Sequence, residues 1–246
     1  MILAIDVGNT NITLGVFNGS QLVKKASIPT KEKNLLPKLK AICSKNKIED
    51  AALCSVVPET TKLLENCLKK ILKKKPYILG KNISVPIKNL YRKPKEVGQD
   101  RLVNAYAGVV LYGAPLVVVD FGTAITFDVI TKDKEYLGGM ILPGLRISLD
   151  ALWQKTALLP QISLSIPGEL IGRDTKQSML SGIVYGVASL TDDLSERIKE
   201  KIGRDALVIG TGGDVNLISS YCKNLDSIDP HLTLKGLNLI FQGRSL

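Results

Sequence analysis

Two stretches of the chain repeat one another, and this repeat limits the available folds more than any other feature. Ile2–Phe17 reads ILAIDVGNTNITLGVF, and Leu116–Ile130 reads LVVVDFGTAITFDVI. Each is an apolar run that ends in Asp, then a turn rich in Gly, Asn or Thr, then a second β-rich run, which is the pattern of a β-hairpin. The two Asp positions, Asp6 and Asp120, lie 114 residues apart. That spacing is too long for a solenoid repeat and is typical of a duplicated domain.

Each hairpin tip has the composition of a phosphate-binding turn. Gly, Asn and Thr allow backbone N–H groups and hydroxyls to approach phosphate closely, and an Asp at the end of the preceding strand can hold the hydrated Mg²⁺ that accompanies a nucleotide. The alternative is an ordinary tight turn in which Asp6 only accepts backbone N–H bonds. Because two copies match, the pattern favours a nucleotide clamp.

Composition narrows the class of protein. The chain has 246 residues, of which 45% are hydrophobic and 23% charged, as in soluble globular proteins. No apolar run approaches the roughly 20 residues that span a membrane, and Met1 leads directly into a strand-like run, so we expect a cytoplasmic protein without a signal peptide. The cysteines lack CxxC or zinc spacing and His231 is the only histidine. This composition argues against a zinc site or a His-based catalytic triad.

The net charge of +10 comes largely from lysines in Lys24–Lys47 and Leu68–Lys75. The second run places leucines at helical spacing with lysines on the other face, which is typical of an amphipathic surface helix. A nucleic-acid face would carry arginines with interleaved aromatics, whereas the aromatic fraction is only 5%. We therefore do not expect nucleic acid as a partner, and a positive surface also attracts anionic substrates.

Each half of the chain predicts three antiparallel strands followed by alternating helices and strands. In the first half we expect strands at Ile2–Asp6, Ile12–Phe17, Gln21–Ile28, Ala51–Val57 and Pro76–Leu79, with helices at Glu32–Asn46 and Pro58–Lys75. In the second half we expect strands at Leu116–Asp120, Ala124–Thr131, Glu135–Leu142 and Ala206–Gly210, with helices from Gly144, Asp174 and Pro230. This order predicts an α/β protein of two RNase H-like domains, 1–113 and 114–246, with mixed sheets. Such a duplication is the actin/hexokinase-like ATPase architecture, whose nucleotide lies in the cleft between the halves.

A second motif, Val97–Arg101 (VGQDR), opens a helix expected at Gly98–Tyr112. Asp100 and Arg101 then lie in its first turn. In one interpretation Asp100 complements the helix dipole and Arg101 is a surface cation. In the other, Asp100 is a general base and Arg101 holds a substrate carboxylate through charge-assisted hydrogen bonds.

Seven motifs in order carry a family resemblance. The segments DVGNTNITLG, GQDR, DFGTAITFD, GGMILPG, GRDT, VIGTGGD and IDPHLTLKGL together resemble type III pantothenate kinase, from Ile2 to about Phe241. The resemblance implies ATP-dependent phosphorylation of pantothenate to 4′-phosphopantothenate, the first step of coenzyme A biosynthesis. It also implies a homodimer, Mg²⁺, and a monovalent cation, K⁺ or NH₄⁺.

The resemblance assigns roles residue by residue. Asp100 would be the catalytic base, Asp6 would engage Mg²⁺ through water, and Asp120 would bind the monovalent cation. The expected ATP-binding residues are Asp6, Val7, Gly8, Asn9, Thr10, Asn11, Ile12, Thr13 and Thr123, with Gly212 and Gly213 beside adenosine. The expected pantothenate-binding residues are Tyr91, Gly98, Gln99, Asp100, Arg101 and Thr175. Many relatives carry a small residue where this chain has Gln99.

Several of these residues have simpler interpretations. Asp120 as a structural carboxylate, Tyr91 as a loop cover, and Thr175 as a helix cap remain open, and Gly144 and Gly212-Gly213 can simply shape strand–helix turns. Two other functions also fit the fold. One is a non-catalytic transcription accessory protein, and the other is a different actin-like small-molecule kinase or phosphatase. A base beside a carboxylate-binding arginine favours pantothenate, because a phosphatase has no clear use for that pair.

Overall fold

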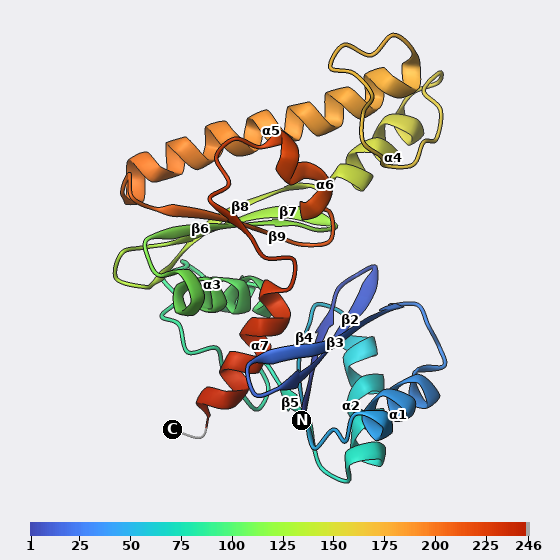
Figure 1. Cartoon of the computed structure of the whole chain (residues 1–246), viewed down its shortest axis with the longest axis vertical. Helices are drawn as coiled ribbons and strands as arrows, with labels where there is room; N and C mark the ends of the chain where they lie inside the picture. Colours follow the sequence, from blue (N-terminus) through green and yellow to red (C-terminus); the bar gives the residue numbers. More distant parts are fainter. Residues whose placement is uncertain (245–246) are drawn as a thin grey trace. The chain divides into compact units, whose positions relative to one another are not determined.

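The computed structural model describes residues 1–244 and contains two five-stranded sheets (Figure 1). Residues 245 and 246, at the end of the expected second domain, lie outside the described residues. The chain forms two compact units. Unit 1 comprises Met1–Ile87, Arg92–Ala107 and the described residues from Leu232 onward, and unit 2 comprises Lys88–Tyr91 and Gly108–His231.

Unit 1 is built on a sheet with strand order β3-β2-β1-β4-β5. Its elements are β1 (Ile2–Val7), β2 (Asn11–Asn18), β3 (Gln21–Pro29), α1 (Leu35–Lys45), β4 (Asp50–Ser55), α2 (Pro58–Leu72), β5 (Tyr77–Ile78), η1 (Pro94–Glu96), the start of α3 (Gln99–Tyr112) and α7 (Leu232–Gly243). The β1–β2 and β2–β3 pairs are antiparallel, whereas β4 pairs parallel to β1 and β5 parallel to β4. The predicted meander followed by parallel strands is confirmed.

Unit 2 repeats this topology with strand order β10-β9-β6-β7-β8. Its elements are β6 (Leu116–Phe121), β7 (Ala124–Ile130), β8 (Tyr136–Pro143), α4 (Leu145–Lys155), α5 (Thr175–Ile202), β9 (Leu207–Thr211), α6 (Val215–Ile218), η2 (Ser219–Tyr221) and β10 (Ser227–Ile228). Asp6 pairs with Thr13 in the first hairpin, and Asp120 pairs with Thr126 in the second. The duplication is therefore confirmed, and β10 completes it as a counterpart of β5 that the sequence did not predict.

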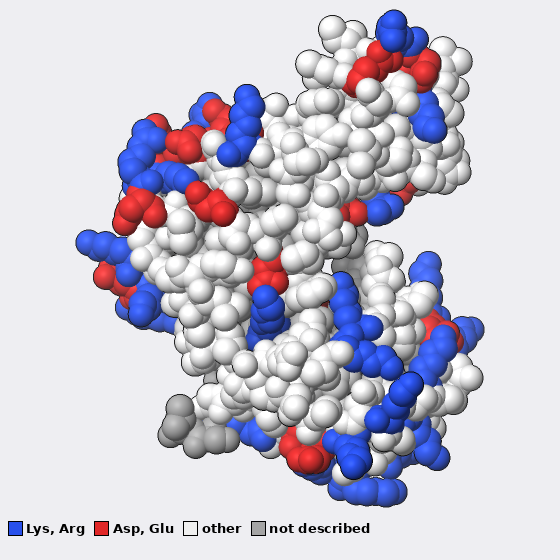
Figure 2. Space-filling model, viewed as in Figure 1, with Lys and Arg blue, Asp and Glu red and all other residues white. Residues whose placement is uncertain are grey.

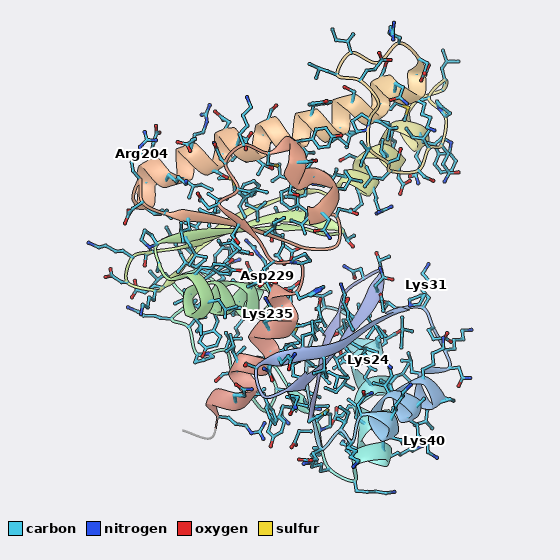
Figure 3. The ribbon with its side chains drawn as sticks, viewed as in Figure 1. Lys24, Lys31, Lys40, Arg204, Asp229 and Lys235 are labelled. Carbon is cyan, nitrogen blue, oxygen red and sulfur yellow. The ribbon has the colours of Figure 1, made fainter. Side chains whose placement is uncertain are left out.

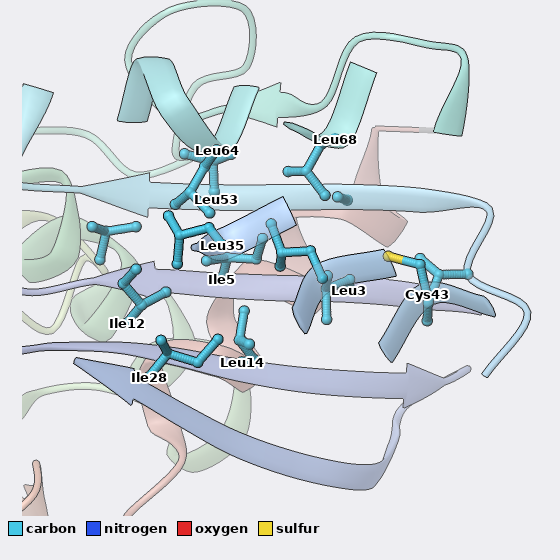
Figure 4. Close-up of a cluster of buried hydrophobic side chains, with 14 of the residues drawn as sticks. Leu3, Ile5, Ile12, Leu14, Ile28, Leu35, Cys43, Leu53, Leu64 and Leu68 are labelled. Carbon is cyan, nitrogen blue, oxygen red and sulfur yellow. The ribbon is translucent and has the colours of Figure 1, made fainter. Parts of the chain in front are cut away.

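Each sheet buries apolar side chains on both faces. In unit 1, Leu3 and Ile5 of β1 pack with leucines of α1 and α2 (Figure 4). Ile2 and Ala4, which alternate with them, pack on the other face against Leu237 and other residues of α7. In unit 2, α5 and α6 cover one face of the sheet (Figure 1), where valines of β6 and β9 pack against them. Alternation along β1 thus places Asp6 on the face that α7 covers.

Three elements differ from the sequence-based expectation. Helix α1 begins at Leu35 rather than Glu32, so Pro37 is its third residue, where no intrahelical N–H bond is lost. Strand β10, which pairs parallel to β9, was not expected from the sequence. The segment 156–174 between α4 and α5, for which no element was expected, has no regular secondary structure. Helix α7, expected in the C-terminal domain, packs on β1 and β4 of unit 1, because its apolar face covers the side of that sheet which α1 and α2 leave open.

Basic side chains are spread over the surface of unit 1 (Figure 2). Figure 3 labels Lys24 on β3, Lys31 in the segment after it, and Lys40 on α1. Helix α2 buries Thr60, Leu64 and Leu68, which confirms the predicted amphipathic surface helix. Within residues 1–244, no helix is long and apolar enough to cross a membrane.

Candidate active site

The tip of the first hairpin is a turn whose main chain is fixed at both ends. The N–H of Gly8 donates to the carbonyl of Asn11 over 2.9 Å. Thr30, just after β3, donates its hydroxyl to the carbonyl of Gly8 (2.7 Å) and its N–H to the carbonyl of Thr10 (3.0 Å). Residues 9–11 remain exposed. Two hydrogen bonds from Thr30 therefore fix the main chain of the predicted phosphate turn. No sequence motif had indicated this residue.

Among the other expected nucleotide-binding residues of this hairpin, some side chains are buried and others are partly exposed. The side chains of Val7 and Ile12 are buried in the core of unit 1, so only their main-chain groups can face a ligand. The carbonyl of Val7 already accepts a bond from Val56 N–H at 3.1 Å. Thr13 is partly exposed and lies opposite Asp6 in the β1–β2 register.

Asp6 stands at the end of β1 in an environment that opposes its charge. Burial, and to a smaller extent the charge of Asp100, raise the pKa of Asp6 from 3.8 to about 6, whereas a hydrogen bond from Cys54 opposes the rise. That bond runs from Cys54 Sγ to Asp6 Oδ1 over 3.3 Å. Since burial raises the pKa of the Cys54 thiol well above its usual value, the thiol stays protonated and acts as the donor.

The first turn of α3 places Asp100 in the electrostatic reach of Asp6. The N–H of Arg101 donates to Asp100 Oδ1 over 2.9 Å, which fixes the orientation of the carboxylate. A Cβ on residue 98 would overlap the same oxygen, so any side chain at Gly98 would displace the Asp100 carboxylate from this position. Two carboxylates from distant parts of the sequence therefore interact electrostatically in unit 1, one at a strand end and one at a helix start.

Arg101 is buried, with 8% of its surface exposed, so the interpretation of Arg101 as a surface cation is wrong. A buried guanidinium is costly unless anions or acceptors compensate its charge. Gln99, two residues before Arg101, packs over Gly80, whose φ is +75°. A methyl group on Gly80 would lie 3.2 Å from Cδ of Gln99, so this glycine provides the space for the bulk that Gln99 adds.

The second hairpin is locked to the start of α4. The N–H of Gly144 donates to the carbonyl of Thr123 over 3.1 Å. A Cβ at residue 144 would overlap the carbonyl oxygens of Gly122 and Thr123. Gly144 therefore does more than shape the corner after β8, because its lack of a side chain allows the tip of the second hairpin to pack against the start of α4. Thr123 itself is exposed at the tip.

Asp120 of β6 is enclosed by a turn that follows β9. Gly212, with φ +98°, approaches the Asp120 carboxylate so closely that no side chain fits between them. Asp214 donates its N–H to the carbonyl of Phe121 (3.0 Å), and its buried carboxylate accepts from Arg146 Nη2 (2.9 Å). The Asp214–Arg146 pair joins the turn after β9 to α4. It was not predicted, because Asp214 ends the VIGTGGD motif whereas Arg146 lies 68 residues earlier and belongs to none of the quoted motifs.

Tyr91 and Thr175 belong to two further parts of unit 2. The Tyr91 ring is partly exposed and packs on Tyr136, with ring centroids 6.5 Å apart. Thr175 is exposed at the start of α5 and lines a cavity of about 560 Å³. The helix cap there is Asp174, whose Oδ1 accepts from Gln177 N–H at 2.8 Å, so capping does not occupy Thr175.

The donor atoms of the two hairpins suit hard cations. No group of three or more His, Cys, Asp or Glu side chains within residues 1–244 is placed to hold a metal ion. The strand-end carboxylates are oxygen donors, which Mg²⁺ prefers, and Mg²⁺ commonly binds through one or two carboxylates plus substrate phosphates. Asp6 therefore fits a cation that arrives with a nucleotide.

Comparison with known proteins identifies relatives over the whole chain. A family model described as type III pantothenate kinase matches residues 2–197. The chain is 41% identical to a type III pantothenate kinase of Agathobacter rectalis, over 98% of this chain and 97% of that one. It is 42% identical to a type III pantothenate kinase of Syntrophus aciditrophicus, over the full length of both chains.

The fold also has relatives of low sequence identity. The structure of a glucokinase from an Antarctic psychrotroph is similar with a TM-score of 0.52 and 10% identity, over 98% of each chain. At that identity the similarity concerns the fold alone. It agrees with the duplicated α/β architecture of the actin/hexokinase-like ATPases that the strand order predicted.

Proposed function

This chain belongs to the type III pantothenate kinase family, and we propose that it transfers the γ-phosphoryl group of ATP to pantothenate. The product is 4′-phosphopantothenate, in the first step of coenzyme A biosynthesis, and we place the reaction in the cytoplasm. The proposal rests on the electrostatic interaction between Asp6 and Asp100 in unit 1. The buried Arg101 directly follows Asp100. A phosphate turn, a base and a cation for a carboxylate are the groups that this reaction needs.

We assign Asp100 the role of general base. Its carboxylate is oriented by the Arg101 N–H and accepts the proton of the primary hydroxyl of pantothenate as that oxygen attacks phosphorus. Arg101 binds the pantothenate carboxylate through charge-assisted hydrogen bonds. The exposed hairpin tip at residues 8–11 and Thr123 bind the phosphates of ATP. Mg²⁺, held through water by Asp6, would neutralise charge on the β- and γ-phosphates.

We propose Asp120 as the ligand of a monovalent cation, K⁺ or NH₄⁺. Its carboxylate lies at the end of β6 close to the glycines at 122 and 212, and carboxylate oxygens are donors that hard cations prefer. The expected roles of Tyr91, Gly98, Gln99 and Thr175 in pantothenate binding, and of Gly212-Gly213 beside adenosine, are part of the same proposal.

We also propose a homodimer, formed through unit 2. Residues 156–174 expose large apolar side chains, Leu158 (92%), Ile166 (66%), Leu170 (62%) and Ile171 (79%). A cluster of this kind on a soluble protein marks an interaction surface. Met179, Leu180 and Val184 of α5 are instead buried within the protomer. Analytical sedimentation tests this interface. We expect the wild type to sediment as a dimer and the double variant Ile171→Lys, Leu158→Ser to sediment as a monomer. A monomeric wild type would exclude the interface.

The first experiment measures ADP release by the purified protein with Mg²⁺–ATP, with and without pantothenate, in K⁺ and again in Na⁺. We expect release that requires both pantothenate and K⁺. Release without pantothenate would indicate another kinase or a phosphatase, and no release under any condition would favour the non-catalytic accessory role. Equal rates in K⁺ and Na⁺ would remove the monovalent cation from Asp120 and leave the kinase assignment intact.

A further inference from the structure

The two hairpin units share one irregularity but differ in what surrounds it. The β2–β3 pairing shifts register between Val16 and Phe17, and the β7–β8 pairing shifts at the equivalent Val129 and Ile130. Through these registers Asp128 occupies the position of Gly15, Tyr136 that of Leu22, and Gly138 that of Lys24. The duplication therefore provides an internal comparison of the same β-bulge in two environments.

In the second copy the bulge contains a buried polar pair. Asp128 and Tyr136 are both fully buried. The Tyr136 hydroxyl donates to Asp128 Oδ1 over 2.9 Å, and the Thr126 hydroxyl donates to Asp128 Oδ2 over 3.2 Å. A buried carboxylate is costly even when it is hydrogen-bonded.

In the first copy the same positions are apolar. Gly15 and Leu22 pack together, and a methyl group on Gly15 would lie 3.0 Å from Cδ1 of Leu22. The bulged hairpin thus forms without an Asp–Tyr pair. The topology of the bulged hairpin therefore does not require the Asp128–Tyr136 pair. The role of this pair is to be found in the surroundings of the second sheet.

Gly138 shows the same contrast. Its φ is +135°, a conformation that favours glycine. Its counterpart Lys24 lies in β3 and is not among the positive-φ residues within residues 1–244. A methyl group on Gly138 would lie 3.2 Å from Cδ2 and 3.4 Å from Cε2 of Tyr91. The glycine therefore provides the space that the Tyr91 ring occupies.

The main chain before Tyr91 is tied to the same strand. Tyr136 N–H donates to the carbonyl of Lys88 (2.8 Å), and Leu90 N–H donates to the carbonyl of Tyr136 (2.9 Å). Tyr91 N–H donates to Asn89 Oδ1 over 2.9 Å. The ring of Tyr91 then packs at 42° to the ring of Tyr136, whose hydroxyl is held by Asp128. Tyr136 thus links Tyr91 to the buried carboxylate.

We propose that Asp128, Tyr136 and Gly138 are positioning residues that fix the Tyr91 ring for contact with the pantothenate substrate. Tyr91 remains partly exposed, so part of this residue is accessible to a ligand. The inference rests on the proposed function, because that function assigns Tyr91 a contact with pantothenate. It assigns these three residues to substrate affinity, and not to the transfer of the phosphoryl group.

The test is a double-mutant cycle between Gly138→Ala and Tyr91→Ala, followed by steady-state kinetics of the full chain. Gly138→Ala should raise the KM for pantothenate by ~10-fold, the usual effect of a small misfit in a binding pocket, with kcat and the KM for ATP within about 2-fold. In the Tyr91→Ala background the same substitution should leave the KM for pantothenate unchanged. Gly113→Ala is the matched control, because φ there is +93° and a methyl group would meet no atom within 4 Å.

The outcomes separate this inference from the proposed function. A wild type without pantothenate-dependent activity would overturn both. An active wild type in which Gly138→Ala leaves the KM for pantothenate unchanged, or raises it equally with and without Tyr91, would overturn the positioning role alone. Tyr136→Phe provides a second variant, which keeps the ring and removes the hydroxyl bond to Asp128. It should raise the same KM, and an unchanged value would remove Asp128 from the positioning role.

Discussion

Cys54 and Asp6 lie opposite each other in the parallel β1–β4 pair, and the thiol of Cys54 donates to Asp6 Oδ1 over 3.3 Å. The equivalent pair in the second sheet is Asp120 and Thr211, which the β6–β9 register places opposite each other. Thiols and hydroxyls are both hydrogen-bond donors. Each strand-end carboxylate therefore has a donor-bearing residue on its parallel neighbour.

This pairing predicts that Cys54 tunes the Mg²⁺ requirement. In Cys54→Ala the Asp6 carboxylate loses a donor, which favours its protonated form, so more Mg²⁺ is needed for half-maximal rate. A thiol is a weak donor, so its bond to the carboxylate should contribute about 0.5–1.5 kcal/mol, the range of an ordinary protein hydrogen bond. This corresponds to roughly a 2- to 10-fold rise in the Mg²⁺ concentration. Cys54→Ser keeps a donor and should stay near wild type. Initial rates over a Mg²⁺ series measure the constant, and equal values for the Ala and Ser variants would contradict the role.

Asp6 itself should reduce stability at neutral pH. Because its pKa is raised from 3.8 to about 6 in the folded protein, the folded state binds more protons than the unfolded state in that interval. The contribution of Asp6 to the free energy of unfolding therefore falls as pH rises from about 4 to about 6. Asp6→Asn should stabilise the protein by ~1–2 kcal/mol at pH 8, a value reduced from the full shift for partial exposure.

Urea unfolding without nucleotide or divalent cation tests this expectation. The gain from Asp6→Asn should shrink as pH is lowered toward 4.5, and activity should be lost at every pH because the ligand for hydrated Mg²⁺ is gone. A variant that is less stable than wild type at pH 8 would show that Asp6 makes net favourable contacts in the folded state.

Asp100→Asn should abolish most turnover while ATP still binds. The amide keeps the shape of the side chain but does not accept the hydroxyl proton, and a positioned base contributes roughly 10²–10⁴-fold to rate. The measurement is kcat beside ATP affinity by calorimetry. Turnover within a few-fold of wild type would remove Asp100 from the role of base.

Arg101→Ala should act mainly on pantothenate. Loss of a charge-assisted bidentate contact to the substrate carboxylate should raise the KM for pantothenate by roughly 10- to 100-fold, since such bonds contribute about 1.5–3 kcal/mol. Because Arg101 is buried, thermal unfolding of the variant must be followed in parallel. Pantothenol, which lacks the carboxylate, provides the control, and an equal loss with both substrates would exclude Arg101 from the carboxylate site.

Gly144→Ala should damage the second phosphate turn. The new Cβ overlaps the carbonyl oxygens of Gly122 and Thr123, and overpacking of this kind costs ~1–3 kcal/mol. The variant should show a lower melting temperature and a higher KM for ATP. Gly186→Ala in α5 is the control, because a methyl group there meets no atom within 4 Å and alanine favours the helix. Equal melting temperatures for both variants would contradict the close approach.

Much of the architecture could be predicted because it depends on local patterns. The hairpins after Asp6 and Asp120 are specified by β-branched runs and by glycine-rich turns. The start of α3 next to Gly98 and the amphipathic face of α2 also follow from short-range periodicity and backbone preference. The predicted turns, strand order and duplication are all present. The candidate residues were found where a motif gathers several of them within a few positions of the sequence.

The tertiary structure alone decided the contacts between segments that are distant in the chain. It placed α7 on β1, Thr30 behind the first phosphate turn, Cys54 beside Asp6, and the segment before Tyr91 along β8. Periodicity shows which face of an element is apolar, but it does not show which other apolar face will cover it. Which two apolar faces pack together depends on how all the elements of the unit fill its closely packed interior. For this reason the sequence identifies the hairpins and a candidate base, and only the folded chain shows which contacts hold these segments in position.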